Sequence, residues 1–491
     1  MGPGPRCAWR DDVLIAADQS SFPSAFHRRP AFAAIPTGAA SNLKISSRQT
    51  GLLLEGVRPS VLRPLAMRLQ MATAVSAPKI TAAPSSVPSA LFNVCFVLFV
   101  INLSFFPAAY FSHAWIYDEH GLGVPTDFVN VWAAGKMVLE GHPALVYDWD
   151  LQKQVELAVL KQGFTGYFAW HYPPPFLFVA SSLAKFPYAA AFIGWLCISL
   201  VPYFAAIRAI VGRNFGWILA LAIPATFNNA LAGQNGFLTA ALIGGALYLL
   251  PTRPFLSGIC LGLLTYKPQY GLLFPLALIA AAEWKVFFSA ALTAVAVALV
   301  SLLAFGMESW QAFFHWIPMF SQAFLTEGKA PWWKMQSIFA LVRYFGGSEP
   351  LGWTFQWVMT ISVAVCVVLI WRSSVRYSLK AASLAAGTLL TTPYLFMYDM
   401  TVLAVPVAFL VRIGIARGFR SYELPAMGVA AALMITFSVC GAPLGLAAAS
   451  IIFALILARC SRRGVVVPLH LLSSPGRVRT EVEGRTQQDA F

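Results

Sequence analysis

Long apolar blocks separated by short polar stretches constrain this chain more than any other feature of its sequence. From about residue 88 to residue 458 they recur at lengths of roughly 17–25 residues, which is the length that crosses a bilayer as a helix. Only 11% of the residues are charged and 58% are hydrophobic, whereas a soluble domain carries about 25% charged residues. The sequence therefore predicts an all-α polytopic membrane protein with about twelve transmembrane helices.

The net charge of +14 is placed mainly at the flanks of the apolar region. Basic residues outnumber acidic ones in residues 1–85 and again after residue 458. This is the distribution that the positive-inside rule produces, so we expect both termini in the cytoplasm and no nucleic-acid partner. The seven cysteines show no zinc-like spacing, and we expect neither a disulfide framework nor a metal site.

Composition divides the chain into three segments. Residues 1–87 are rich in Ala, Ser, Pro and Arg without a sustained period, which predicts a disordered basic extension. A mis-assigned start codon is the alternative explanation, because a start at Met67 or Met71 would leave a short cytoplasmic leader. Residues 88–460 form the membrane domain, and residues 461–491 are expected to be a cytoplasmic tail.

Two longer polar segments, residues 113–172 and residues 307–350, interrupt the apolar blocks. Acidic residues outnumber basic ones in the first, and the second contains four tryptophans, a residue type that favours the membrane interface. We expect both to be extracytoplasmic loops. In the first loop, FVNVWAAGKMVLEG has apolar residues at helical spacing and predicts an amphipathic helix at the membrane surface.

Two topologies fit the apolar blocks. In one, residues 173–207 form two spans and residues 255–282 form a single helix broken at Lys267–Pro268. That topology places three arginines outside the cytoplasm, against the positive-inside rule: Arg208, Arg213 and Arg253. In the other, residues 173–207 cross once and residues 255–282 form a hairpin. We prefer the second, in which four polar residues face the same side of the membrane: Asp127, Gln234, Lys267 and Asp399.

Asp127 lies just beyond the first apolar block, at the start of the predicted amphipathic helix. Its carboxylate has two interpretations, which the residues alone leave open. As a helix cap, Asp127 or its neighbour Thr126 would accept hydrogen bonds from backbone N–H groups of the first turn. As a functional group, it would be a carboxylate at the membrane–water boundary that can deprotonate a hydroxyl.

Other polar residues lie where a bilayer penalises them. Lys267 stands between two apolar blocks, and a charge at the bilayer centre costs about 2.5–3.5 kcal/mol on insertion scales, so such residues are usually functional. The alternative is an interfacial turn whose lysine reaches water. Gln234 and Asn235 form either a turn or a hydrogen-bonding site. The remaining candidates for donor or acceptor binding are these: His171, Tyr172, Gln269, His315 and Asp399.

Asp148-Trp149-Asp150 has the DxD pattern of many metal-dependent sugar-nucleotide enzymes. Three residues carry little specificity, and an N-cap before LQKQVELAVL explains Asp150 well. A glycine-rich phosphate loop, a HExxH motif and a GxSxG motif are absent from the sequence. We therefore expect neither a metal nor a cofactor.

Four segments taken together resemble a known family: DFVNVWAAGKMVLEGHPALVYD, HYPPPFLF, LAGQNGFLTAALIGGAL and GICLGLLTYKPQYGLL. They are similar to glycosyltransferase family 87, a group in the GT-C class that includes mycobacterial polyprenol-phosphate-mannose-dependent α-mannosyltransferases. The likeness covers about residues 88–460. Each segment is short, but their order and spacing make the resemblance fairly specific. The basic N-terminal extension departs from the family pattern.

The resemblance implies a helical GT-C fold in the plasma (inner) membrane, with its active site on the outer face. It also implies an inverting hexosyltransferase whose donor is a polyprenyl-phosphate sugar and whose acceptor is a glycolipid or envelope glycan. Mannose is the hexose expected on the donor. By the family's pattern the catalytic base is the Asp of the first outer loop, which maps onto Asp127. Lys267 or another cation would offset the charge of the departing phosphate. Two other classes stay open, a secondary transporter and a non-catalytic envelope-assembly subunit. A transporter would show an internal repeat between its halves, and the sequence shows none.

Overall fold

The computed structural model describes residues 86–461, and in this part of the chain the regular structure is helical. Pairing of β type is limited there to three isolated bridges. The predicted N-terminal extension and C-terminal tail lie outside the described residues, apart from residues 86, 87 and 461. In chain order the elements are α2 (Ser89–Phe111), α3 (Phe128–Leu139), η1 (Leu145–Tyr147), α4 (Trp149–Leu160), η2 (Pro174–Phe176), α5 (Leu177–Leu183), α6 (Tyr188–Val211), α7 (Phe215–Ala222), α8 (Ala225–Ala232), α9 (Gly236–Leu249), α10 (Pro254–Leu263), η3 (Leu264–Tyr266), η4 (Pro268–Tyr270), α11 (Leu273–Ala280), α12 (Trp284–Ser321), η5 (Gln322–Thr326), η6 (Trp332–Lys334), α13 (Ile338–Tyr344), α14 (Glu349–Arg372), α15 (Tyr377–Leu390), η7 (Asp399–Leu403), α16 (Ala404–Arg417), α17 (Glu423–Cys440) and α18 (Gly445–Ser461).

Five helical segments among the described residues are long and apolar enough to cross a membrane: α2, α6, α12 with η5, α14, and η7 with α16. A sixth span results if α7 and α8, which are bent by 68° at their junction, are counted as one. Further apolar helices of 10–17 residues lie between these spans and after the last of them. The prediction of an all-helical membrane protein is confirmed, whereas the count of about twelve spans is not.

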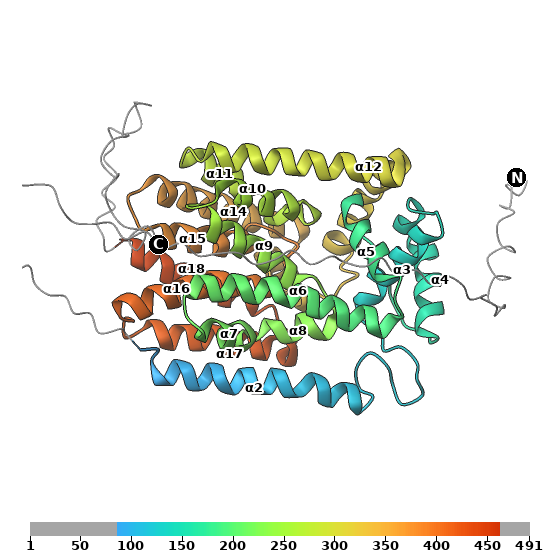
Figure 1. Cartoon of the computed structure of the whole chain (residues 1–491), viewed down its shortest axis with the longest axis horizontal. Coiled ribbons are helices and arrows are strands. Elements are labelled where there is room, and N and C mark those ends of the chain that lie inside the picture. The colour runs from blue at the N-terminus through green and yellow to red at the C-terminus, as the bar shows by residue number, and fades with distance from the viewer. Residues whose placement is uncertain (1–85, 462–491) are drawn as a thin grey trace, which may run out of the picture. The chain divides into compact units, whose positions relative to one another are not determined.

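The spans differ in how much of their surface the protein itself covers. In the most apolar 18 residues of α2, and likewise of α12, only 11% are buried inside the protein. In the segment formed by η7 and α16 the corresponding share is 89%. In Figure 1, α2 and α12 run along opposite sides of the helical part of the chain. Helices with exposed apolar sides are suited to contact with lipid, and the η7–α16 segment is suited to the protein interior.

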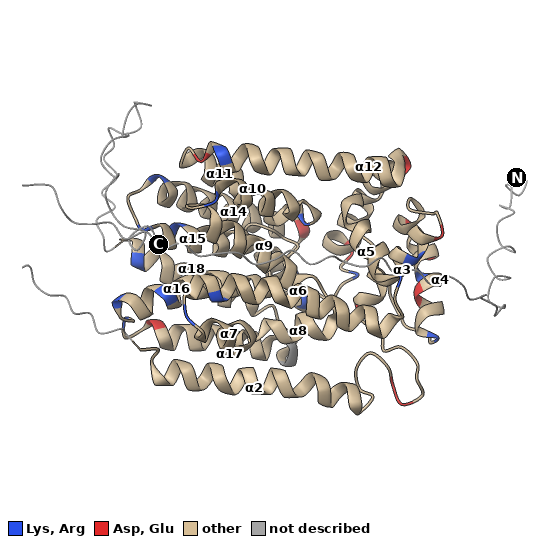
Figure 2. Cartoon of the chain, viewed as in Figure 1, with Lys and Arg blue, Asp and Glu red and all other residues tan. Residues whose placement is uncertain are grey.

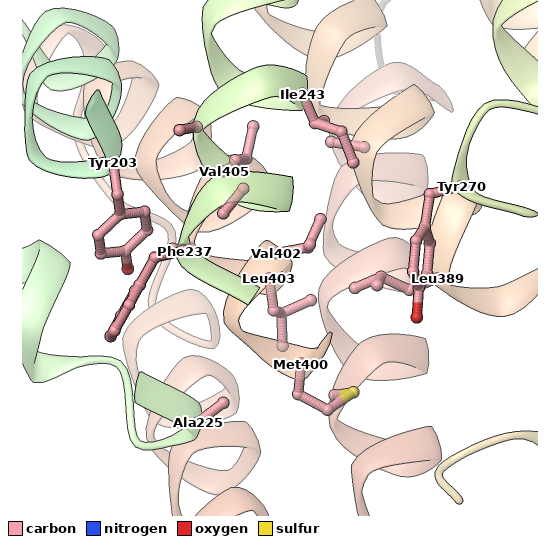
Figure 3. Packing of buried hydrophobic residues seen from close by; sticks show 14 of the residues in the cluster. Tyr203, Ala225, Phe237, Ile243, Tyr270, Leu389, Met400, Val402, Leu403 and Val405 are labelled. Atoms are coloured by element: carbon pink, nitrogen blue, oxygen red, sulfur yellow. The ribbon is translucent and has the colours of Figure 1, made fainter. Parts of the chain in front are cut away.

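The core is built around the start of α16. Figure 3 shows side chains of η7 and α16, including Val402, Leu403 and Val405, between Phe237 of α9 and Leu389 of α15. All five are less than a tenth exposed. Asp399 is the first residue of η7, so this packing fixes the position of a charged group inside the protein.

Prolines separate helices at three places in the apolar part of the chain. Pro187 precedes α6 and separates it from α5, Pro224 separates α7 from α8, and Pro268 separates η3 from η4. Proline lacks the N–H that continues a helix and restricts the residue before it. The block at residues 255–282 is therefore interrupted at Lys267, as both predicted topologies required.

The second polar loop begins later than the sequence predicted. We expected it to start at residue 307, but α12 continues to Ser321 and η5 follows it to Thr326. The backbone of Gly306 has φ 77° and ψ 166°, which is a kink rather than an end. Glycine adopts such a conformation without steric cost, so the helix resumes beyond it.

Basic side chains gather at one end of the helices. Figure 2 shows most of the Lys and Arg of the helical part at the end where α14 is followed by α15. Ten basic residues that the preferred topology assigns to the cytoplasm are at or near helix ends: Arg208, Arg213, Arg253, Lys285, Arg372, Arg376, Lys380, Arg412, Arg417 and Arg420. This grouping favours the preferred topology, because one membrane face would then carry the positive charge.

A labelling experiment tests this orientation. Cysteine introduced at Glu140, an exposed residue after α3, should react with a membrane-impermeant thiol reagent in intact cells. Cysteine introduced at Ser374, an exposed residue between α14 and α15, should react only after the cells are opened. The reverse pattern would contradict the outer placement of residues 113–172.

Candidate active site

A chain of hydrogen bonds joins three residues that are far apart in the sequence. The Nε2 atom of Gln234 donates to Oδ2 of Asp127 at 2.9 Å. The hydroxyl of Tyr172 donates to Oε1 of Gln234 at 3.1 Å. Gln234 and Tyr172 are 4% and 1% exposed, and Asp127 is partly buried at the edge of the group. Gln234 thus holds the Asp127 carboxylate in place from the turn between α8 and α9.

The Asp127 side chain does not cap α3. Its backbone already has helical angles, φ −60° and ψ −21°, and its carboxylate makes no capping hydrogen bond. An N-cap residue normally has an extended backbone that lets its side chain reach the first turn. The hydroxyl of Thr126 lies near the Tyr188 hydroxyl instead, at 3.5 Å. The capping interpretation is therefore wrong for both residues, and the Asp127 carboxylate is left for other contacts.

Burial has the largest effect on the Asp127 carboxyl group and raises its pKa above the ordinary value of 3.8. The hydrogen bond from Gln234 and the charges of Lys334 and Lys267 lower that pKa, and the charge of Asp399 raises it. A carboxylate with a raised pKa is a stronger base than an ordinary Asp. Oδ1 of Asp127 accepts no hydrogen bond from the described residues, so it is open to a substrate hydroxyl.

A second acid lies in the same electrostatic environment. Glu156 of α4 is 1% exposed, and its Oε1 atom has no hydrogen-bond partner in the described part of the chain. Burial raises the pKa of Glu156 to about 8, and the charge of Asp127 adds to the rise. Glu156 is therefore mostly protonated at neutral pH and adds little negative charge beside Asp127.

Lys267 and Asp399 form a buried ion pair. Nζ of Lys267 lies 2.6 Å from Oδ1 of Asp399, and the two residues are 3% and 1% exposed. The lysine also lies 5.9 Å from the ring centre of Tyr270 and 5.3 Å from that of Tyr398. Lys267 therefore does not reach out to water, and the interpretation of this segment as a simple interfacial turn is wrong.

Two glycines allow the turn that carries Gln234 to pack closely. Gly233 has a positive φ of 66°, and a Cβ atom there would lie 2.7 Å from Cβ of Phe128. A Cβ atom on Gly236 would lie 2.6 Å from the backbone oxygen of Tyr398. The turn thus touches α3 on one side and the segment before Asp399 on the other. This contact brings the Asp127 group and the Lys267–Asp399 pair into one region.

Tyr266 and Asn235 line the same region. The hydroxyl of Tyr266 lies 2.6 Å from Oγ1 of Thr239 and donates to the backbone oxygen of Asn235 at 3.4 Å. Its ring stacks on Phe176 at 4.8 Å. The side-chain oxygen of Asn235, a residue that is 2% exposed, accepts no hydrogen bond in the described part of the chain. An unpaired buried amide oxygen of this kind is a candidate acceptor for a ligand hydroxyl.

The remaining predicted residues are placed differently. His171 packs against the ring of Tyr172 at 4.3 Å, and burial lowers its pKa to about 4, so it is neutral at pH 7. Gln269 is partly buried in η4, and His315 is exposed on α12. No hydrogen bond among the described residues joins Gln269 or His315 to Asp127.

The DxD segment has a local structural role. Asp148, and not Asp150 as the sequence suggested, caps α4 by accepting from the N–H groups of Asp150 and Leu151. Asp150 accepts a hydrogen bond from the hydroxyl of Tyr167 at 2.9 Å. Within residues 86–461, no group of three or more His, Cys, Asp or Glu is arranged to hold a metal ion.

Sequence reasoning missed Lys334, the last residue of η6. Its charge lowers the pKa of Asp127 more than the charge of Lys267 does. The sequence shows it only as a lysine after two tryptophans, Trp332 and Trp333, which is the usual composition of a membrane interface. Its place next to the site depends on the folding of the second loop.

The comparisons with known proteins give one match. The model of glycosyltransferase family 87 matches residues 170–393, which confirms the family resemblance and indicates a glycosyltransferase. The matched region contains Gln234 and Lys267, whereas Asp127 precedes it and Asp399 follows it. No curated protein and no solved structure matches the chain.

Breaking the ion pair between Lys267 and Asp399 should lower the stability of the protein. Lys267→Met leaves the buried Asp399 carboxylate without its partner, and breaking a buried pair in this way costs about 3–5 kcal/mol. Thermal unfolding of the purified protein in detergent should show a clear loss for this variant and partial recovery in Lys267→Met/Asp399→Asn. Lys136→Met, which removes an exposed pair with Glu140, is the control and should change stability by about 1 kcal/mol or less. A single variant as stable as wild type would contradict the structural role of the pair.

Proposed function

We propose that this chain is a glycosyltransferase of family 87 that moves a hexose from a polyprenyl-phosphate sugar to a glycolipid or envelope-glycan acceptor. Mannose is the hexose that we propose. The reaction takes place at the outer face of the cytoplasmic (inner) membrane, inverts the anomeric configuration, and uses Asp127 as the general base. The proposal rests on the family match of residues 170–393 and on the position of Asp127.

The state of the Asp127 carboxylate is the observation that carries this proposal. One oxygen is held by Gln234, the other accepts nothing from the described residues, and the side chain is released from capping α3. Burial also raises its pKa. A positioned carboxylate with a free oxygen and increased basicity is suited to accept a proton from a hydroxyl.

The transfer step follows from this arrangement. The acceptor hydroxyl oxygen attacks the anomeric carbon, its proton moves to Asp127, and the bond from that carbon to the phosphate oxygen breaks. The electron pair of the broken bond stays on the polyprenyl phosphate. Because phosphate is a good leaving group without protonation, one carboxylate is sufficient. A single in-line displacement turns a β-linked donor into an α-linked product.

A lipid-linked donor agrees with the membrane character of the chain. Nucleotide sugars are not available outside the cytoplasm, whereas a prenyl chain keeps its phosphosugar at the membrane surface. The hydroxyl of Tyr172 and the amides of Gln234 and Asn235 offer donors and acceptors for sugar hydroxyls at the edge of the membrane domain. Gln234 would then both orient Asp127 and bind substrate.

Two other functions remain as alternatives. A secondary transporter also places polar residues at broken helices, and an assembly subunit would need no base at Asp127. The family match supports glycosyl transfer over both. In an assembly subunit, neutral replacement of Asp127 would leave function intact.

Replacement of Asp127 by Asn tests the base directly. The amide keeps the size of the side chain but cannot take up the proton, so transfer should fall by about 10²–10⁴-fold. Sugar transfer from a polyprenyl-phosphate donor by purified protein is the measurement, with thermal stability checked in parallel. Asp150→Asn, an exposed acid of α4, is the matched control and should keep its activity. Retention of more than about a tenth of the activity by Asp127→Asn would remove the assignment.

The raised pKa also sets the direction of the pH dependence. Asp127 must be ionised to act as a base, so the rate should fall as the pH is lowered through its pKa. Because burial raises this pKa above 3.8, the acid limb should lie at higher pH than for an ordinary Asp. A profile of kcat/KM against pH measures this limb. A flat profile down to pH 4 would contradict the environment described for Asp127.

A further inference from the structure

The two lysines near Asp127 differ in what neutralises them. Lys267 is paired with Asp399 at 2.6 Å in the protein interior. Lys334 is exposed, and no carboxylate of the described residues lies within ion-pair distance of its Nζ atom. The positive charge of Lys267 is therefore already balanced, whereas that of Lys334 is available to a ligand.

The position of Lys334 is fixed by its backbone. The N–H of Met397 donates to the backbone oxygen of Lys334 at 2.9 Å, and the N–H of Gln336 donates to that of Leu395 at 2.5 Å. These bonds surround an antiparallel bridge between Met335 and Phe396. The second outer loop is thus joined to the segment that leads directly into Asp399.

Gln336 strengthens this junction. Its side chain accepts from the N–H of Gly445 at 2.7 Å and donates to the backbone oxygen of Trp333 at 2.6 Å. Gln336 is fully buried, and its neighbour Met335 is too. The backbone that carries this exposed lysine is therefore held from two sides and is not a free loop.

Charge moves during the transfer step in a way that needs such a cation. The donor is a phosphodiester with one negative charge, and Asp127 starts as a carboxylate. When the acceptor proton reaches Asp127 and the bond to phosphate breaks, Asp127 becomes neutral and the released polyprenyl phosphate carries one more negative charge. A cation near both groups stabilises the charge at its origin and at its destination.

We propose that Lys334 binds the phosphate of the lipid-linked donor, and that Lys267 is reserved for the structural pair with Asp399. The assignment rests on the proposed function, because it concerns the leaving group of that reaction. It names Lys334, in place of Lys267, as the cation that offsets the phosphate charge. Lys334 would contact the reacting phosphate and is a catalytic residue in that sense.

Loss of the Lys334 charge has a second consequence at Asp127. The titratable groups that influence Asp127, or are influenced by it, are these: Lys267, Lys334, Asp399, Glu156, Tyr172, Tyr188 and Tyr398. Lys334 lowers the pKa of Asp127. Its removal should therefore raise that pKa and move the acid limb of the rate profile to higher pH. This shift reports the charge of Lys334 at Asp127, whereas contact with the phosphate is measured by binding.

The experiment compares uncharged and charged replacements in the full-length protein. Lys334→Gln and Lys334→Met should raise the KM for polyprenyl-phosphate mannose and weaken binding of polyprenyl phosphate by about tenfold or more, as expected for loss of a hydrogen bond between charged groups. Lys334→Arg keeps the charge and should restore most of the binding. Lys329→Gln is the matched control, because Lys329 is in the same loop and is paired with Glu327 at 3.1 Å.

Direct binding separates this inference from the proposed function. If wild type binds polyprenyl phosphate but transfers no sugar, the proposed function fails while Lys334 can still be judged by binding. Equal binding by wild type and Lys334→Gln would overturn the assignment. So would an equal loss of phosphatidylglycerol binding in the variant, because Lys334 would then recognise anionic lipid in general. Dephosphorylated polyprenol should bind all variants alike.

Discussion

The ion pair between Lys267 and Asp399 is the interaction on which the arrangement of the site depends. It joins the break between η3 and η4 to the start of η7, and both partners are almost completely buried. A lone charge at this depth would be strongly unfavourable, so each partner requires the other. Side chains of η7 and α16 pack in the core, as Figure 3 shows for Val402, Leu403 and Val405. This packing fixes the position of Asp399, which holds Lys267 through the ion pair. The lysine that stands out between two apolar blocks of the sequence is thus ion-paired inside the protein.

The breaks in the helices explain why the polar groups meet. A continuous helix satisfies its own backbone and offers few polar groups at membrane depth, whereas an interrupted one exposes backbone and side chains that need partners. The turn with Gln234, the break with Lys267 and the segment before Asp399 are all interruptions of this kind. Close packing at Gly233 and Gly236 brings them together. We propose that sugar hydroxyls and phosphate use the polar atoms that remain free there.

Local signals were sufficient for part of this picture. Apolar runs predicted α2 and the helical membrane character, and Pro268 predicted the break after Lys267. Composition also identified Asp127, Gln234, Lys267 and Asp399 as exceptional. The sequence does not show which of these residues contact each other. Lys267 and Asp399 are 132 positions apart, and Gln234 and Asp127 are 107 apart. Lys334 was missed for the same reason, since its surroundings depend on how the second loop folds. The continuation of α12 was missed because nothing local distinguishes a kink from an end.

The central claim is that this chain uses a lipid-linked sugar. Purified protein in proteoliposomes should be supplied in turn with labelled mannose on polyprenyl phosphate and on a nucleoside diphosphate, together with a glycolipid acceptor fraction. We expect label to pass to the acceptor from the polyprenyl phosphate alone. Transfer only from the nucleotide sugar would contradict the claim, and so would the absence of transfer from either donor by folded protein.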